Sequence, residues 1–317
     1  MSRPAVAMTV AGSDSGGGAG MQADLHTFAA FGVHGTTAVT AVTVQNTVGV
    51  SGVHEIPPAI VAEQIRVVVE DLRPTAVKTG MLASAPIILA IGAAFRRHGI
   101  GRDGTIPLVL DPVCASMHGH ALLRPDALAA LRDMFALATV VTPNLDETEL
   151  LVGTRDQPAA ARALLALGPR YALVKGGHGT GPRSRDLLTD GSTELWLDAA
   201  RIETGNTHGS GDTLAAAITA RLALGDSLTV AVETAKRYVT RAVAAGYSVG
   251  AGHGPVGHPP AHESTPPSDP AAPGGPAFLS GAAVSGGGAV SGGGSAASGG
   301  GAASGAAGAG ARVEAGP

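Results

Sequence analysis

The chain has 317 residues, a formal net charge of −4 at pH 7 and an isoelectric point near 6.2. This balance excludes the strongly basic surface of a nucleic-acid-binding domain, and an aromatic content of 3% leaves few rings on which bases can stack. Its single cysteine, Cys114, excludes an internal disulfide and is typical of a reducing, cytoplasmic compartment, and we expect no membrane-spanning stretch.

The first predicted unit is a strand, a glycine-rich loop and a helix. An apolar run at 5–11 is typical of a buried strand, and GSDSGGGAG at 12–20 leads into an amphipathic helix from about Met21. Glycines at the carboxyl end of a parallel strand let the backbone approach a ligand. The loop has neither the Walker Lys-Ser/Thr nor clean GxGxxG spacing, so the sequence disfavours a dinucleotide site.

Two polar side chains are candidates for reading a small heterocycle. The β-branched run at 36–44 predicts a strand that ends in Gln45-Asn46-Thr47. The Gln45 amide has a donor and an acceptor and can pair with an aminopyrimidine edge, while Asp24 can accept from an amino or hydroxyl group. The alternative is a surface-facing helix Asp and a strand-end Gln that bind nothing.

A helix at 57–71, a strand at 75–81 and a helix at 86–98 follow. The strand ends in a glycine turn and Met81, which either closes an apolar pocket or belongs to the core.

Acidic residues follow the next two strands. The strand at 107–111 ends in Asp111, and the strand at 139–142 is followed by Pro-Asn-Leu-Asp-Glu147. Carboxyl ends of parallel strands meet at one edge of a sheet, so Asp111 and Glu147 are candidates for holding a Mg²⁺ that bridges nucleotide phosphates. Glu147 fits equally well as a first-turn charge that complements a helix dipole.

A further strand at 171–174 leads to Lys175-Gly-Gly-His. A lysine beside flexible glycines can meet phosphate oxygens, and a solvated turn lysine is the alternative. We expect a β-hairpin at 186–198 and a long helix at 227–247.

The stretch TGNTHGSGDTLAAAITA at 204–220 runs from a glycine-rich turn straight into an alanine-rich helix. The first N–H groups of a helix lack intrahelical partners and carry partial positive charge, so Gly209, Ser210 and Gly211 can surround an anion. Next to such an anion hole, the Asp212 carboxylate can accept a proton from an attacking hydroxyl. The alternative is an ordinary loop in which the aspartate caps the helix.

The alternation of strands and helices predicts a three-layer α/β/α sandwich with a mostly parallel central sheet, formed by residues 1–258. Loops at the carboxyl ends of its strands then share one crevice. From 259 to 317 the chain is rich in Pro and then in Gly, Ala and Ser. This composition predicts a disordered tail, because it cannot bury enough apolar surface to offset chain entropy.

Seven motifs in this order resemble one enzyme family over residues 4–258: AGSDSGGGAGMQADL, AVTVQNT, KTGM, DPV, TPNLDE, VKGGH and NTHGSGDT. They are similar to the hydroxymethylpyrimidine and phosphomethylpyrimidine kinases of thiamine biosynthesis, which are ribokinase-like. The combination is specific, whereas no single motif is. The resemblance implies that ATP, with Mg²⁺, phosphorylates 4-amino-5-hydroxymethyl-2-methylpyrimidine and then converts the monophosphate to the diphosphate.

The resemblance also implies roles for individual residues. The implied pyrimidine contacts are Gly12, Asp24, Gln45, Met81 and Val113. The implied ATP contacts are Asn144, Lys175, Thr207, Gly209 and Gly211, and the implied catalytic group is Asp212 with Lys175, Gly209 and Gly211. The implied partners are the pyrimidine and ATP, and a second copy of the chain, since relatives are often dimers.

Asp212 is a departure from many of these kinases, which carry cysteine there, whereas sugar kinases of the wider family carry aspartate. A carboxylate base suits deprotonation of the hydroxymethyl group, but it places negative charge near the phosphate that is the second nucleophile. Two other functions stay open. A pyridoxine or pyridoxal kinase is disfavoured by Gln45, and a non-catalytic pyrimidine-binding protein is disfavoured by the intact Asp212, Lys175 and glycine turn.

Overall fold

The structure is a computed structural model that describes residues 3–115 and 122–261, so nearly all of the predicted tail at 259–317 lies outside it. The strands are β1 (Val6–Ser13), β2 (His34–Asn46), β3 (Gly49–Glu55), β4 (Ala76–Thr79), β5 (Leu108–Leu110), β6 (Val140–Val141), β7 (Tyr171–Val174), β8 (Arg183–Thr189) and β9 (Glu194–Ala200). Within the described residues they form one nine-stranded sheet in the order β3-β2-β1-β4-β5-β6-β7-β8-β9.

Eight α-helices accompany this sheet in the described part of the chain. They are α1 (Gly20–Ala30), α2 (Pro58–Leu72), α3 (Ala85–Arg97), α4 (Leu128–Met134), α5 (Leu145–Val152), α6 (Gln157–Leu165), α7 (Ser210–Ala223) and α8 (Leu228–Ala244). None of these helices is long and apolar enough to cross a membrane.

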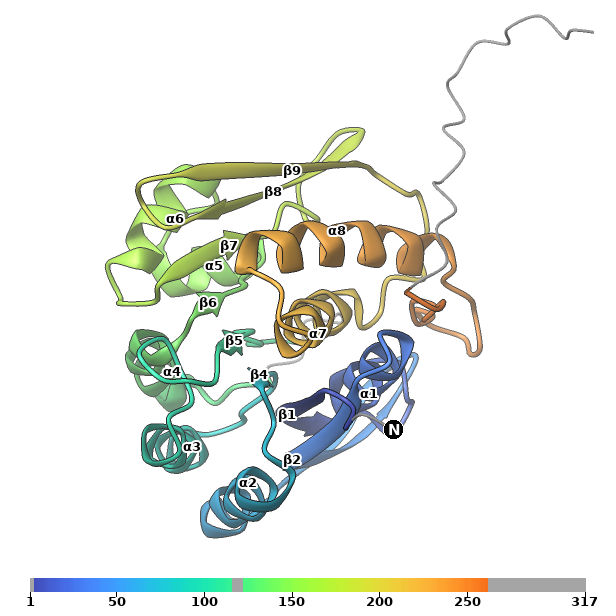
Figure 1. Cartoon of the computed structure of the whole chain (residues 1–317). Coiled ribbons are helices and arrows are strands. Elements are labelled where there is room, and N and C mark those ends of the chain that lie inside the picture. The colour runs from blue at the N-terminus through green and yellow to red at the C-terminus, as the bar shows by residue number, and fades with distance from the viewer. Residues whose placement is uncertain (1–2, 116–121, 262–317) are drawn as a thin grey trace, which may run out of the picture. The chain divides into compact units, whose positions relative to one another are not determined.

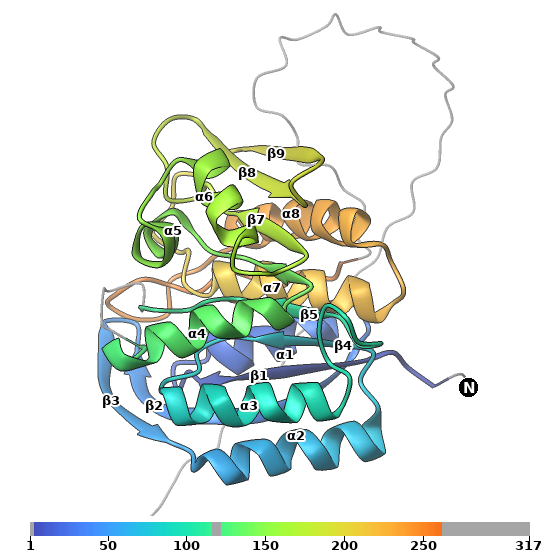
Figure 2. The same cartoon turned by 90° about the vertical axis from the view of Figure 1, so that its left-hand side faces the viewer.

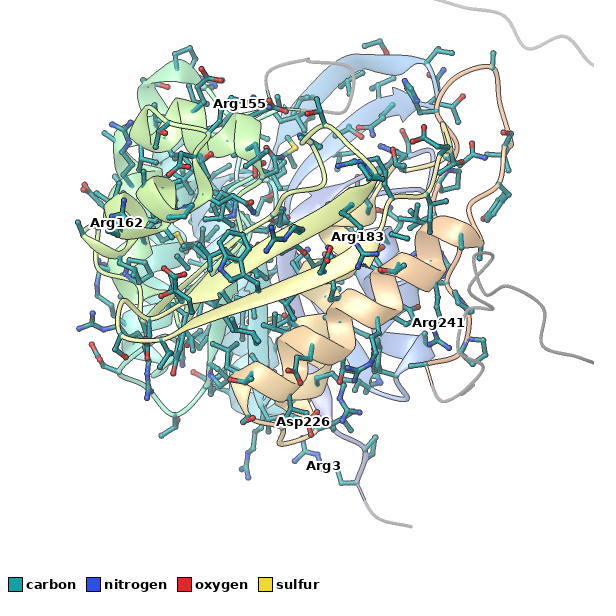
Figure 3. The ribbon with its side chains drawn as sticks, turned by 90° about the horizontal axis from the view of Figure 1, so that it is seen from above. Arg3, Arg155, Arg162, Arg183, Asp226 and Arg241 are labelled. Atoms are coloured by element: carbon teal, nitrogen blue, oxygen red, sulfur yellow. The ribbon has the colours of Figure 1, made fainter. Side chains whose placement is uncertain are left out.

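The helices form two layers, one on each face of the sheet. Helices α1, α7 and α8 cover one face and α2 to α6 cover the other (Figures 1 and 2). The six central strands β2, β1, β4, β5, β6 and β7 run parallel to one another. At one edge β3 pairs antiparallel with β2, and at the other edge β8 and β9 form an antiparallel hairpin beside α8 (Figure 3). The predicted three-layer, mostly parallel fold is confirmed.

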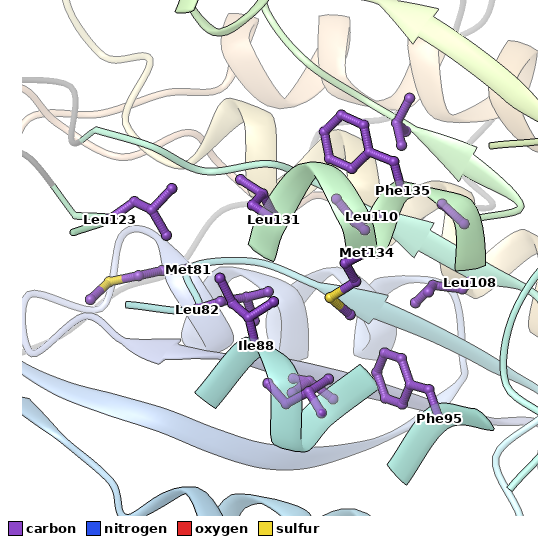
Figure 4. Packing of buried hydrophobic residues seen from close by; sticks show 14 of the residues in the cluster. Met81, Leu82, Ile88, Phe95, Leu108, Leu110, Leu123, Leu131, Met134 and Phe135 are labelled. Carbon is purple, nitrogen blue, oxygen red and sulfur yellow. The ribbon is translucent and has the colours of Figure 1, made fainter. Parts of the chain in front are cut away.

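Both layers bury apolar side chains against the central strands. Strands β4, β5 and β6 are buried along their whole length, as expected where helices cover both faces of a parallel sheet. Under α3 and α4 the larger cluster packs long aliphatic and aromatic side chains together (Figure 4). Those that Figure 4 labels are Met81, Leu82, Ile88, Phe95, Leu108, Leu110, Leu123, Leu131, Met134 and Phe135.

The strands and helices that the sequence predicts are all present, with ends shifted by a few residues. Four strands and α-helices are additional, namely β3, α4, α5 and α6, as are two short 3₁₀ helices at Pro125–Ala127 and Phe135–Leu137. Strand β3 gives no clean alternation because it contains Gly49 and Gly52 and exposes Val53. Gln45 lies within β2 and not after it, because the strand continues to Asn46 before it turns into β3.

The sheet order creates a topological switch point between β1 and β4. Strand β1 pairs with β2 on one side and with β4 on the other, and the intervening helices α1 and α2 lie on opposite faces. In open α/β sheets ligands bind outside the carboxyl ends of the strands at such a point. Gly12 lies near the end of β1, the glycine-rich loop at 14–19 follows that strand, and Gly80 follows β4.

Candidate active site

The two glycine-rich motifs meet at the N-terminus of α7. Gly209 precedes the helix in a left-handed conformation with φ of 77°, and a Cβ on it would lie 2.0 Å from the carbonyl oxygen of Gly18. Only glycine allows this close approach. From the same loop, the Gly20 N–H donates to Asp212 Oδ2 at 3.0 Å, so the loop after β1 fixes the candidate base on α7.

The Asp212 carboxylate lies at the switch point. A Cβ on Gly80 would be 3.7 Å from Asp212 Oδ1 and 3.0 Å from the Cβ of Ala11, at the ends of β4 and β1. The Asp212 side chain is 16% exposed. Its neighbour in the first turn, Gly211, has an amide without a protein acceptor in the described residues. A partly exposed carboxylate therefore stands beside an unpaired backbone N–H of the helix N-terminus, although the Ser210 N–H donates to the Thr207 carbonyl at 3.1 Å.

Lys175 and Asp111 also lie at this end of α7. Lys175 Nζ donates to Asp111 Oδ1 at 2.9 Å, and a Cβ on Gly211 would lie 3.5 Å from the same Nζ. Burial lowers the pKa of Lys175, but the carboxylates of Asp111 and Glu147 outweigh it and raise the pKa above its usual range. Lys175 is therefore a charged ammonium next to the helix N-terminus. A cationic side chain beside backbone N–H groups is a favourable binding site for a phosphate.

Glu147 is a helix cap as well as a member of this charge cluster. Its Oε2 accepts from the Asn144 N–H at 2.8 Å, while the Asn144 side chain accepts from the Glu147 N–H at 2.9 Å, a reciprocal capping box that starts α5. Glu147 thus has the alternative role that the sequence allowed, an acidic side chain in the first turn of a helix. Burial raises the pKa of Glu147 to about 7, Asp111 adds to the rise and Lys175 opposes it.

The described residues contain no group of three or more His, Cys, Asp or Glu side chains arranged for a metal ion. Magnesium in phosphoryl-transfer sites is bound by one or two carboxylates together with substrate phosphates, so such a cage is not required. The neighbouring Asp111 carboxylate repels the negative charge on Glu147 and so contributes to raising the pKa of Glu147. A divalent cation relieves this repulsion, and these residues therefore fit the ion.

Three of the predicted pyrimidine contacts lie near the carboxyl ends of β1, β4 and β5. Met81 is 7% exposed, its carbonyl accepts from Thr40 Oγ1 at 2.6 Å, and a Cβ on Gly12 would lie 3.1 Å from its sulfur. Val113 is partly buried against the same apolar cluster. Met81 thus belongs to the core and also adjoins the glycine loop.

Asp24 lies in a different position from the one that the sequence predicts. It is fully buried, Oδ1 accepts from Lys78 Nζ at 2.5 Å and Oδ2 accepts from Thr9 Oγ1 at 2.6 Å. Both oxygens have protein partners and neither reaches a surface, so direct contact with a pyrimidine does not agree with this geometry. The sequence predicted that Asp24 faces a ligand because it is a polar residue in an amphipathic helix, whereas in the structure this side of α1 faces the interior.

Gln45 is connected to the glycine loop through a histidine. Its amide nitrogen lies 3.3 Å from His208 Nε2, and the same His208 atom lies 3.0 Å from Asp14 Oδ2. Asp14 also accepts from the amides of Gly16, Gly18 and Ala19 at 2.8 to 3.0 Å. A cavity of about 310 Å³ opens beside Gln45 at the turn between β2 and β3.

Asp14 shapes the loop through its charge, which predicts a pH-dependent contribution to stability. Burial raises the pKa of Asp14, but the hydrogen bonds from His208 and Gly16 lower it more, so the pKa lies below its ordinary 3.8. The folded state thus favours the ionised form, and this stabilisation is present above about pH 4 and is lost as the pH falls.

Asp14→Asn is expected to lower the free energy of unfolding by about 2 kcal/mol at pH 7, since it removes charge-assisted hydrogen bonds. Urea unfolding at pH 7 and pH 3 measures this. The difference between the variant and the parent protein should shrink at the lower pH, and an equal difference at both values would contradict a role for the charge.

Sequence reasoning missed Lys78, Asp14 and His208. The Lys78 position was part of the KTGM motif, but a lysine within an apolar strand gave no sign that it would be fully buried. Asp14 and His208 stand within the two glycine motifs, and their pairing was not visible because 194 positions separate them.

Comparison with known proteins agrees with this geometry. The profile of the phosphomethylpyrimidine kinase family matches residues 14–257, which include the second glycine motif, most of the first, and every predicted site residue except Gly12. The chain belongs to the phosphomethylpyrimidine kinase family. Like its relatives it is a kinase, and the expected ribokinase-like resemblance is confirmed.

Relatives of this kinase are similar along most of their length. A hydroxymethylpyrimidine/phosphomethylpyrimidine kinase of Mycobacterium leprae is 55% identical over 264 residues, which cover 80% of this chain and 93% of the relative. The protein of the same name from Streptomyces coelicolor is 51% identical over 261 residues, which cover 80% of this chain and 94% of the relative.

Two solved structures support the fold of this kinase. The pyridoxal kinase of Staphylococcus aureus in complex with AMP-PCP and pyridoxal matches with a TM-score of 0.74 at 33% identity, over 83% of this chain and 96% of that one. A phosphomethylpyrimidine kinase of Clostridium difficile matches with a TM-score of 0.65 at 39% identity, over 75% of this chain and 99% of that one.

Proposed function

We propose that this kinase transfers the γ-phosphoryl group of ATP to the hydroxymethyl group of 4-amino-5-hydroxymethyl-2-methylpyrimidine, and then a second phosphoryl group to the monophosphate, for thiamine diphosphate biosynthesis. The observation that carries the proposal is the partly exposed carboxylate of Asp212 beside the unpaired Gly211 amide at the N-terminus of α7, with Lys175 next to it. The membership of the family and the names of its relatives support the choice of substrate.

In the first step Asp212 accepts the proton of the hydroxymethyl group while the hydroxyl oxygen attacks the γ-phosphorus. The bond between the γ-phosphorus and the bridging oxygen breaks, and ADP leaves. The amides around Gly209 and Gly211 donate hydrogen bonds to the transferring group, and the Lys175 ammonium offsets its charge. Asn144 and Thr207 complete the proposed ATP contacts.

Asp111 and Glu147 are the residues that would hold Mg²⁺ with the nucleotide. A Mg²⁺ held there would supply positive charge to the phosphates of the nucleotide. Asp111 Oδ1 is held by Thr142 Oγ1 at 2.8 Å as well as by Lys175, so its orientation is set before any nucleotide arrives.

Gln45 is proposed to read the aminopyrimidine edge, with Gly12, Met81 and Val113 around the ring. Gln45→Ala is expected to raise the KM for the pyrimidine by roughly 10-fold to 100-fold, which corresponds to a loss of about 1.4 to 2.8 kcal/mol of polar contact. Steady-state kinetics with saturating ATP measures this. An unchanged KM would remove Gln45 from the pocket, and Gln64→Ala, which removes hydrogen bonds to Val39 instead, is the matched control.

Product analysis of the purified protein with Mg-ATP tests the function. We expect diphosphate from both the hydroxymethylpyrimidine and its monophosphate. The structural likeness to a pyridoxal kinase favours vitamin B6 salvage as the second candidate function. Preferential turnover of pyridoxal would replace the proposed function, and monophosphate as the sole product would limit Asp212 to the alcohol kinase step.

We further propose a homodimer in the cytoplasm. Val42 and Val44 lie on the same face of β2 and are 45% and 62% exposed, and exposed apolar side chains side by side near a sheet edge are typical of a surface that pairs with another subunit. The one cysteine, Cys114, is buried and free. Sedimentation velocity measures the oligomeric state.

A further inference from the structure

Lys78 is a buried ammonium group to which the reaction as described above assigns no role. It lies in β4 with none of its side chain exposed, 2.5 Å from Asp24 Oδ1 and 3.5 Å from Asp212 Oδ1. An ionised amine in a protein interior requires a partner of opposite charge. Burial lowers the pKa of Lys78, but Asp24 and Asp212 raise it more, so the amine is charged.

The two carboxylates that share Lys78 differ in what they can reach. Asp24 is fully buried and its second oxygen is occupied by Thr9 Oγ1. Asp212 is partly exposed and its second oxygen accepts from the Gly20 amide. Lys78 therefore connects an inaccessible counter-ion to the carboxylate that faces the substrate.

The two proposed phosphorylation steps make opposite demands on Asp212. The first acceptor is a neutral alcohol, whose proton must go to a base. The second acceptor is a phosphate monoester whose attacking oxygen is already deprotonated, so it needs no base, and a bare carboxylate nearby repels it. In that step the new bond joins this oxygen to the γ-phosphorus, and ADP again leaves with the electrons of the broken bond.

We propose that Lys78 is a positioning residue for Asp212 that also offsets its charge, so that one carboxylate base can work beside an anionic acceptor. This inference rests on the proposed function. Lys78 holds the Oδ1 side of the carboxylate while Gly20 holds the Oδ2 side, and Asp24 keeps the ammonium ionised in the absence of substrate.

The test compares Asp24→Asn with the double variant Lys78→Met/Asp24→Asn, since the double variant removes the lysine without leaving an unpaired buried carboxylate. Calorimetry without nucleotide gives the Kd of the hydroxymethylpyrimidine and of its monophosphate. Relative to Asp24→Asn, the double variant is expected to bind the monophosphate about 10-fold more weakly, as for loss of a close favourable charge, and the neutral pyrimidine within about threefold.

The second part of the test asks whether the affinity for the monophosphate can be restored. Asp212→Asn added to the double variant is expected to restore monophosphate affinity, because the charge that Lys78 offsets is then gone. Equal weakening for both pyrimidines would show a merely structural role, and unchanged monophosphate affinity would show no offset. Either result overturns the inference.

The parent protein separates the inference from the function on which it rests. If the parent binds neither pyrimidine, the proposed function itself is wrong. If the double variant does not fold, Asp212→Asn alone decides the inference: with Lys78 in place, the Kd of the monophosphate should change by less than about threefold, and a 10-fold tightening would show an uncompensated carboxylate.

Discussion

Asp212→Asn is expected to lower kcat for phosphorylation of the hydroxymethylpyrimidine by about 10²-fold to 10⁴-fold, the usual contribution of a positioned general base. The amide has the shape of the carboxylate and can still accept from the Gly20 N–H, which is 3.0 Å from Asp212 Oδ2. Binding of ADP and the melting temperature should therefore stay close to those of the parent protein. Single-turnover kinetics with saturating pyrimidine measures the chemical step.

Asp226→Asn is the matched control for this substitution. Asp226 follows the opposite end of α7 and pairs with Arg221 at 2.5 Å, so its loss leaves the N-terminus of the helix untouched. The kcat of this control should equal that of the parent. A near-normal kcat for Asp212→Asn as well would show that another group takes the proton.

Gly209→Ala is expected to reduce kcat/KM by about 100-fold or more, the cost of losing a preorganised anion-binding donor. The added Cβ would lie 2.0 Å from the Gly18 carbonyl oxygen, and the backbone has φ of 77°, so the turn cannot keep its position. The strain should also lower the free energy of unfolding by about 1 to 3 kcal/mol. Steady-state kinetics and urea unfolding measure the two effects.

Gly205→Ala distinguishes this effect from a general intolerance of the segment. Gly205 lies four residues earlier, its backbone is not left-handed, and a Cβ there would have no neighbour within 4 Å. Activity and stability of this control should match the parent protein. If Gly209→Ala behaves in the same way, the close approach of the two motifs is unimportant for turnover.

Much of the fold could be predicted because buried parallel strands and their helices leave clear apolar patterns. The same reasoning placed Asp111, Lys175 and Asp212 after strands or at a helix start, and in the structure these residues converge around Gly211. Short or exposed elements such as β3, with glycines and half-exposed valines, carry no such pattern and were missed.

Side-chain partners across the sheet were harder to predict than the elements. Asp24 was assigned to the substrate, yet it pairs with Lys78, which is 54 positions away. Nothing in either local sequence shows that an acid and a base will be buried together, because that depends on which faces of α1 and β4 meet. Glu147 similarly has a capping role that local sequence allowed, beside the charge cluster that only the fold brings together.

The hydrogen bond from Gly20 to Asp212 joins positions 192 residues apart. Such a contact closes a very long loop, so its entropic cost is met only after the sheet between the two motifs has formed, and the site is expected to assemble late in folding. Helix α1 also packs on α7, and β1 pairs with β4, so the two motifs stay together until this core opens. Amide hydrogen exchange at Gly20 should therefore report global unfolding rather than movement of a surface loop.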